Sequence, residues 1–320
     1  MKSKKTLLIV LAIAIIGGII GYNYIYQDHR DIESEKAAYT VKATDFIKEF
    51  QTNEAEDITK VISSQMLEND LTKKNLKGNI KSRAVLVYEA KIKDGYVTNG
   101  AVKGGIKTTY NTFGNKVDMV TYDENKKVVN TWKYTYDASN NLLESNYSDD
   151  NVRRKISYNY NAKNQLTSSE ESVNEKLVKK MTYTYDETGN EIENESSFVE
   201  SKGKSRNEHA YDEKGHLRET NIYDEKDVLQ LKQLYTYNEA GQEVQQSIFT
   251  GNNAPSYKRT SEYDAKGNKT KDAAFTGDGV VNPSDTYKYK YEYDEKGNWT
   301  TQIRSNYNGV ADQFIEQELT

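Results

Sequence analysis

The chain has 320 residues, of which 35% are hydrophobic, and a mean hydropathy of −0.91. So polar a composition argues against a large aliphatic core. Disorder is disfavoured as well, because disordered segments are depleted in aromatic residues and often rich in proline, whereas this chain has 26 tyrosines and only two prolines. The absence of cysteine excludes disulfides, thiolate metal sites and cysteine nucleophiles. A net charge of −5, with lysine and glutamate interleaved, argues against nucleic acid as a partner, since that role needs a basic stripe.

Residues 1–26 have the features of a membrane anchor. Three lysines precede an uncharged stretch from Thr6 to Tyr26, which as a helix would reach about 30 Å, enough to span a bilayer. The tyrosines at its end and the lack of a small-residue cleavage site favour a retained anchor over a cleaved signal peptide. We therefore expect residues 6–26 to lie in the lipid bilayer. The positive-inside rule then predicts a single-pass membrane protein with its bulk extracytoplasmic, in the periplasm or at the cell surface.

Residues 27–70 are charged and compatible with helix, with Phe46, Ile47 and Phe50 at helical spacing. They predict a short helical stalk or cap. The stretch 28–56 resembles the juxtamembrane start of small membrane-anchored bacterial proteins that continue into an OB-fold. That resemblance implies anchoring and does not imply ligand binding.

Residues 71–320 repeat one phrase, Tyr-x-Tyr-Asp/Asn-x-x-Gly-Asn, whose clearest copies begin at Tyr183 and Tyr291. The phrase recurs about every 26 residues, and such a period indicates a repeat architecture. Each period holds two turn signals, so half a period is one strand and its connection. A first strand is predicted at 84–90, followed by a hairpin turn at Asp94–Gly95. We expect a mainly β fold, an antiparallel meander of about eight repeats that forms a curled sheet and buries its tyrosine face.

The turn of each repeat has its own signature. Glycine supplies the positive φ that the turn requires, and the preceding Asp or Asn bonds back to the backbone. These structural turn residues are Gly189, Gly215, Gly241, Gly267 and Gly297.

The repeated phrase resembles that of the YD-repeat, or Rhs-repeat, proteins over about residues 76–320. The array here is short and divergent, because Asn follows the glycine, as in Gly189-Asn190, where the family commonly has Arg-Leu. The resemblance implies long antiparallel sheets and a short, anchored protein of the bacterial cell envelope. Without the family's Asp-Pro self-cleavage motif, it does not imply an encapsulated toxin.

No catalytic motif is present, so we expect neither an enzyme nor a cofactor. Metal binding is not expected either, since each turn offers one or two carboxylates, and His209 and His216 have a spacing that fits no zinc motif and are predicted to be exposed. Three aromatic residues are candidates for contact with a ligand or partner, with core filling as the alternative: Trp132, Trp299 and Tyr307.

The sequence thus predicts a membrane-anchored, extracytoplasmic β-repeat scaffold or interaction protein of the bacterial envelope. It is expected to be non-catalytic and to bind an unidentified envelope protein or a glycan. The alternative is a carbohydrate-binding module that uses exposed aromatic residues.

Overall fold

The computed structural model describes residues 69–320. One short helix, α4 (Asp70–Lys73), is capped by Asn69, whose side-chain oxygen accepts hydrogen bonds from the amides of Leu71 and Thr72. All other regular structure is β. The strands are β1 (Ser82–Lys93), β2 (Tyr96–Tyr110), β3 (Lys116–Tyr122), β4 (Val128–Tyr136), β5 (Leu142–Ser148), β6 (Arg153–Tyr160), β7 (Leu166–Val173), β8 (Lys176–Tyr185), β9 (Glu191–Phe198), β10 (Lys204–Tyr211), β11 (Leu217–Tyr223), β12 (Leu229–Tyr237), β13 (Glu243–Thr250), β14 (Pro255–Tyr263), β15 (Lys269–Thr276), β16 (Val281–Tyr293), β17 (Trp299–Ser305) and β18 (Ala311–Leu319).

The chain divides into two compact units, Met1–Lys77 and Gly78–Thr320. The predicted anchor of residues 1–26 and nearly all of the stalk predicted at 27–70 lie outside the described residues. The domain boundary predicted at residue 71 therefore stays a prediction. All strands belong to the second unit.

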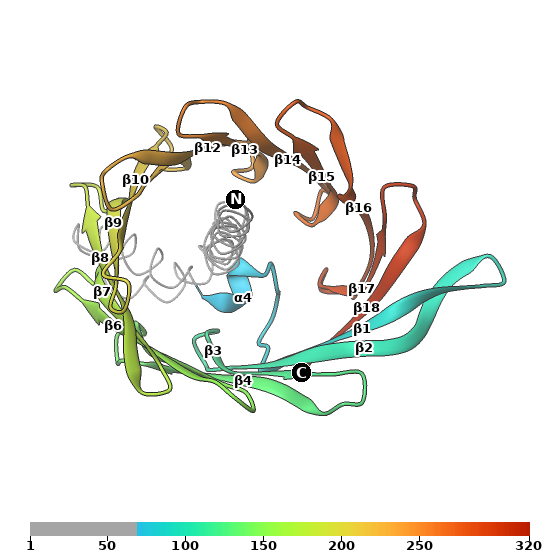
Figure 1. Cartoon of the computed structure of the whole chain (residues 1–320). Coiled ribbons are helices and arrows are strands. Elements are labelled where there is room, and N and C mark those ends of the chain that lie inside the picture. The colour runs from blue at the N-terminus through green and yellow to red at the C-terminus, as the bar shows by residue number, and fades with distance from the viewer. Residues whose placement is uncertain (1–68) are drawn as a thin grey trace, which may run out of the picture. The chain divides into compact units, whose positions relative to one another are not determined.

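The strands form one closed ring (Figure 1). Each strand pairs antiparallel with the next along the chain, and β1 also pairs with β18, from Arg83 opposite Leu319 to Glu89 opposite Gln313. The end of the chain is held at this seam, where the Thr320 carbonyl accepts from the Ser82 amide at 3.0 Å and the Thr320 amide donates to the Ser82 carbonyl at 3.0 Å. Closure leaves no free edge strand along the ring.

The turns after the even-numbered strands share one geometry, shown by the turn at Asp186. Its carbonyl accepts from the Gly189 amide, and its carboxylate accepts from the amides of Thr188 and Asn190. The pairing register shifts by one residue beside it, so this is a type I turn with a glycine bulge. The five predicted turn glycines have φ values of 94°, 84°, 78°, 86° and 83°, in chain order. The predicted hairpin turn at Asp94–Gly95 is confirmed, with φ values of 52° and 82°.

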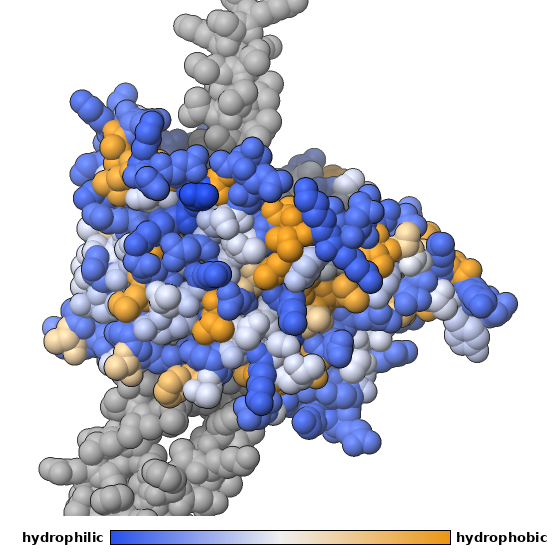
Figure 2. Space-filling view, turned by 90° about the horizontal axis from the view of Figure 1, so that it is seen from below, coloured by the Kyte–Doolittle hydropathy of each residue, from blue (hydrophilic) through white to orange (hydrophobic). Residues whose placement is uncertain are grey.

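The two sides of the wall differ in chemistry. Along β8, Lys180, Thr182 and Thr184 are exposed, whereas the alternating Met181, Tyr183 and Tyr185 are partly buried. Side chains converge on the concave side of a ring, so the tyrosine side is the interior. The outer wall carries cross-strand ion pairs such as Lys180–Glu170 at 2.6 Å and Lys204–Glu195 at 2.8 Å. Figure 2 shows one face of the molecule that is mostly hydrophilic, with separate hydrophobic patches.

The predicted curled sheet is wrong, because its two ends pair and close it into an 18-stranded barrel. The predicted helix ahead of it has no counterpart in residues 69–320, which contain no helix that is long and apolar enough for a membrane crossing. Consecutive antiparallel strands follow the predicted order. The closing pair was missed because its two strands stand at opposite ends of the repeat domain and have no signature of their own.

Replacing Gly215 by Val should destabilise the barrel by about 1 kcal/mol or more, because a β-branched residue is strained at positive φ. The φ of Gly215 is 84°, and no heavy atom lies within 4 Å of an added Cβ, so backbone strain is the whole effect. Gly215→Asn is the matched control, since Asn140 and Asn164 hold the same turn position at φ values of 67° and 60°. Thermal melting of the full chain compares them. Equal melting temperatures for the two variants would contradict the turn assignment.

Candidate functional site

The interior wall is held by tyrosine hydroxyls. At six places in the described sheet, a tyrosine at or near the end of an even-numbered strand donates to the carbonyl of the first residue of the preceding strand, at 2.7 to 2.9 Å. Tyr160, for example, bonds to the Leu142 carbonyl at 2.9 Å. Each bond joins one hairpin to the next at the same rim. The tyrosines therefore stabilise the barrel wall, so the repeated phrase has a structural role.

Other interior side chains are satisfied in a similar way. The hydroxyls of Ser145 and Tyr158 lie 3.1 Å apart, and Arg259 contacts the carboxylates of Asp272 and Asp285 at 2.7 Å each. Burial raises the pKa of Tyr160, Tyr183 and Tyr291 to about 12. These phenols thus stay neutral at any physiological pH, and they act as hydrogen-bond donors and packing groups.

The three predicted contact residues do not form one platform. Trp132 lies on β4 and stacks on Tyr134 with ring centroids 6.0 Å apart, while Trp299 lies on β17 under the guanidinium of Arg83. Five strand-to-strand steps around the ring separate β4 from β17. Tyr307 is in the turn between β17 and β18 and is 47% exposed. The structure brings none of these aromatic rings into contact with another of the three.

Neither His209 nor His216 is exposed as predicted: the side chain of His216 is 11% exposed and its ring stacks on Tyr237, with ring centroids 4.8 Å apart. His209 is buried, with Nδ1 3.0 Å from the Thr220 hydroxyl and Nε2 3.1 Å from the Asn194 amide nitrogen, so its predicted exposure is wrong. It lies on the interior face, opposite Thr220 on β11, while Asn194 on β9 is the ladder partner of Asn207. Within residues 69–320 no group of three or more potential ligands is arranged to hold a metal ion.

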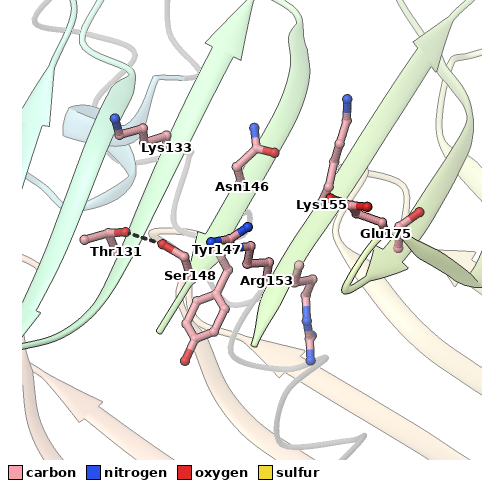
Figure 3. Close-up of a pocket in the computed structure, with 10 residues that line it drawn as sticks. Thr131, Lys133, Asn146, Tyr147, Ser148, Arg153, Lys155 and Glu175 are labelled. Carbon is pink, nitrogen blue, oxygen red and sulfur yellow. Dashed lines mark hydrogen bonds between the residues drawn. The ribbon is translucent and has the colours of Figure 1, made fainter. Parts of the chain in front are cut away.

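A shallow groove of about 540 Å³ crosses strands β4 to β7 (Figure 3). Two cross-strand rows build it. Lys133, Asn146 and Lys155 are successive partners on β4, β5 and β6. Thr131, Ser148 and Arg153 form the second row, with the two hydroxyls 2.8 Å apart. Partners across a ladder share a face, so each row presents its side chains together.

The charges of the groove are partly unpaired. Lys155 is paired with Glu144, and Arg154 with Glu171 at 3.2 Å. Lys133 and Arg153 have no ion pair with any described residue. Two free cations beside hydroxyl and amide donors make an arrangement that can bind an acidic group through charge-assisted hydrogen bonds. No group that could act as an activated nucleophile is evident in the groove.

Sequence reasoning missed this groove because lysine and glutamate alternate throughout the repeats. The run Arg153-Arg154-Lys155 is the signal that points to it. Even so, Lys133 joins the groove only through the pairing of β4 with β5 and of β5 with β6.

No family model matches the chain, and no curated protein matches it. Solved structures similar to it include a porin-like protein from Bacteroides uniformis, with TM-score 0.40, 9% identity, and coverage of 76% of this chain and 98% of that one. A porin-like protein from Bacteroides vulgatus gives TM-score 0.34 and 10% identity over 75% of this chain and 98% of that one. A structure of TcdB2-TccC3-Cdc42 gives TM-score 0.24 and 10% identity over 69% of this chain and 16% of that one. Similarity this low carries no functional argument.

These findings correct two predictions. The assignment to the YD-repeat family is wrong: no family model matches the chain, and the strands close into a barrel where the resemblance implies long antiparallel sheets. The phrase itself is what a hairpin array with type I turns and glycine bulges requires, so it does not specify one family. The prediction of a single-pass helical membrane protein is also wrong for the described chain, which forms a barrel and has no helix able to cross a membrane. The stretch 28–56, with its resemblance to anchored OB-fold proteins, lies outside the described residues.

The interior tyrosines predict a loss of stability at alkaline pH. Their folded pKa, about 12, lies above the ordinary value of 10.0, so between these values the folded barrel binds more protons than the unfolded chain. Stability is therefore full below pH 10 or so and should fall as pH rises toward about 12. Melting temperature against pH, together with ultraviolet titration of tyrosinate, measures both effects.

Tyr160→Phe removes one of these groups and should make the fall shallower. A single titration midpoint near the ordinary pKa, with a flat melting temperature across this range, would contradict the buried interior.

Proposed function

We propose that the protein is a non-catalytic interaction barrel that binds an acidic ligand or an acidic segment of a partner in the groove on β4 to β7. The observation that carries this proposal is the pair of free cations, Lys133 and Arg153, beside the hydroxyls of Thr131 and Ser148. Carboxylate, sulfate and phosphate groups accept from such donors. The extent of the groove, with donors from four strands, suits a ligand larger than a single inorganic ion.

The charged outer surface of the barrel supports a protein that binds its ligand in water and does not span a bilayer with its strands. Charged side chains occupy outward positions along the strands, among them Lys155, Lys180 and Lys271, each in a cross-strand ion pair. A lysine at the middle of a lipid-facing strand costs roughly 2–4 kcal/mol. Such a wall is stable against water. Among the described residues of the groove, the two cations without an ion pair, Lys133 and Arg153, outnumber the one lining carboxylate without one, that of Glu175.

The hydrogen bonds of the interior tyrosines support the view that the barrel is a rigid scaffold. Hydroxyl-to-carbonyl bonds tie successive hairpins together, so the strands that carry the groove keep their register. A preorganised donor set loses less entropy when a ligand binds. The barrel is on this account a frame that holds surface groups in place.

Reversal of the two free charges should weaken binding. We expect Lys133→Glu with Arg153→Glu to weaken the binding of a sulfated, heparin-derived hexasaccharide by about ten-fold or more, because two charge-assisted contacts become repulsive. Isothermal titration of the full chain measures it. Lys290→Glu is the matched control, an exposed outward lysine on β16.

A neutral hexasaccharide should show no binding to the unchanged protein. Equal affinity of all variants for the sulfated probe, or equal affinity of the protein for the neutral one, would contradict the proposal.

A further inference from the structure

The two rims of the barrel differ in the residue that closes each turn. In most of the turns the first residue donates its amide to the carbonyl of the residue four positions later, whereas the turns after β1, β5, β7 and β9 are closed differently. The turns after even-numbered strands form the polar rim, and they close with Asn115, Asn141, Gln165, Asn190, His216, Gln242, Asn268 and Asn298. The turns after odd-numbered strands form the apolar rim. There Val228, Ala254, Val280 and Val310 close four of the turns, and Val128 follows the turn that closes with Lys127.

These apolar residues are exposed. Val228, Val280 and Val310 are 52%, 60% and 57% exposed. The same rim bears the tip of the β1–β2 hairpin, which extends beyond the ring in Figure 1, and there Ile92 and Tyr96 are 74% and 76% exposed. Large apolar residues so exposed at one end of a molecule indicate an interaction surface. Among the turn residues of the polar rim, only Phe113 is comparably exposed.

The tip of the hairpin is a part of this rim with little support of its own. β1 pairs with β18 only as far as Glu89, and β2 pairs with β3 only from Gly105 onward. Residues 90–99 therefore form a two-stranded ribbon held by its own ladder, from Ala90 opposite Asn99 to Lys93 opposite Tyr96. Such a ribbon is marginally stable in water. An apolar environment at its tip would stabilise it.

The spacing of the exposed apolar residues on the apolar rim indicates what kind of partner surface they can contact. Large exposed ones occur in or beside the turns after β1, β3, β9, β11, β15 and β17. Two strand steps place successive turns about 10 Å apart, with polar turn residues between the apolar ones. The buried centre of a protein–protein interface is a continuous, desolvated patch, which this ring does not offer. The headgroup region of a bilayer is fluid and accepts separate apolar tips, and tyrosines such as Tyr96 and Tyr307 prefer that region.

We infer that the apolar rim rests on the surface of a lipid bilayer, with the tip of the β1–β2 hairpin and the rim valines inserted among the headgroups. The outer wall stays in water, since its outward positions carry ion pairs. Charges of both signs occur in the rim turns, for example Lys226 and Asp278, so insertion of apolar side chains is the driving force. The inference does not depend on the groove.

The chain has no cysteine, which permits a clean local test. Val280→Cys and Val310→Cys, each in the full chain, are labelled with the polarity-sensitive dye NBD and mixed with phosphatidylcholine vesicles. We expect a blue shift and roughly a two-fold or larger rise in emission, with quenching by spin-labelled lipid. Ala240→Cys on the polar rim is the matched control and should show neither change. Because the readout is local, attachment of the protein to vesicles by another segment does not count as support.

A second variant tests the cause. Val228→Asn, Val280→Asn and Val310→Asn together copy the polar rim, where Asn closes the same turn, so the fold is kept. In this background a dye at position 92, introduced by Ile92→Cys, should lose most of its vesicle-induced rise. Equal responses at positions 280 and 240, or an undiminished response in the triple variant, would overturn the inference. A rise with excess unlabelled protein and no lipid would assign the rim to a second copy of the chain and overturn it as well.

Discussion

The pairing of β1 with β18 is the constraint on which the rest of the barrel depends. Seven residue pairs join strands at opposite ends of the repeat domain, and the backbone of Thr320 bonds to Ser82 beside them. With this seam formed, every strand has two neighbours and no edge is open to another chain. Without it, the array would present two long edges and its interior side would face water. Closure thus defines an inside and an outside, and both proposed surfaces are defined relative to them.

The interior wall of the barrel is lined by tyrosines, which are polar aromatic residues, instead of by aliphatic residues. Tyrosine supplies a large apolar ring and a hydroxyl that needs a partner, and the structure gives that hydroxyl a carbonyl on the neighbouring hairpin. This explains how a chain with 35% hydrophobic residues folds. Net hydrogen bonds contribute roughly 1 kcal/mol each, so the stabilisation is distributed over many repeats. Because the stabilising contacts lie on the interior side, the residues of the outer face and of the turns can differ in charge and polarity.

Local features of the fold were readable from the sequence, and long-range ones were not. Alternation, the period and the Asp94–Gly95 turn locate strands and hairpins because each is a property of a few adjacent residues. Closure depends on the pairing of β1 with β18, and neither strand has a sequence pattern that marks it as a closing strand. The sequence was therefore equally compatible with an open, curled sheet. The groove shows the same limit, since Lys133 and Arg153 come to the same face of the sheet only through the register of β4 and β6 with β5. His209 was misjudged because its burial depends on partners supplied by two other strands. A repeated turn phrase, likewise, reports hairpin geometry and does not define a family.

Closure itself can be tested by a cross-link across the seam. Ala84 lies opposite Glu318, and Cα atoms of paired residues are close enough for a disulfide. The double variant Ala84→Cys with Glu318→Cys, oxidised in the full chain, should give one intramolecular disulfide, which peptide mapping by mass spectrometry detects without background because the chain has no other cysteine. Ala84→Cys with Ala240→Cys is the control and should stay reduced. Free thiols in both variants, or disulfides only between molecules, would contradict a closed barrel.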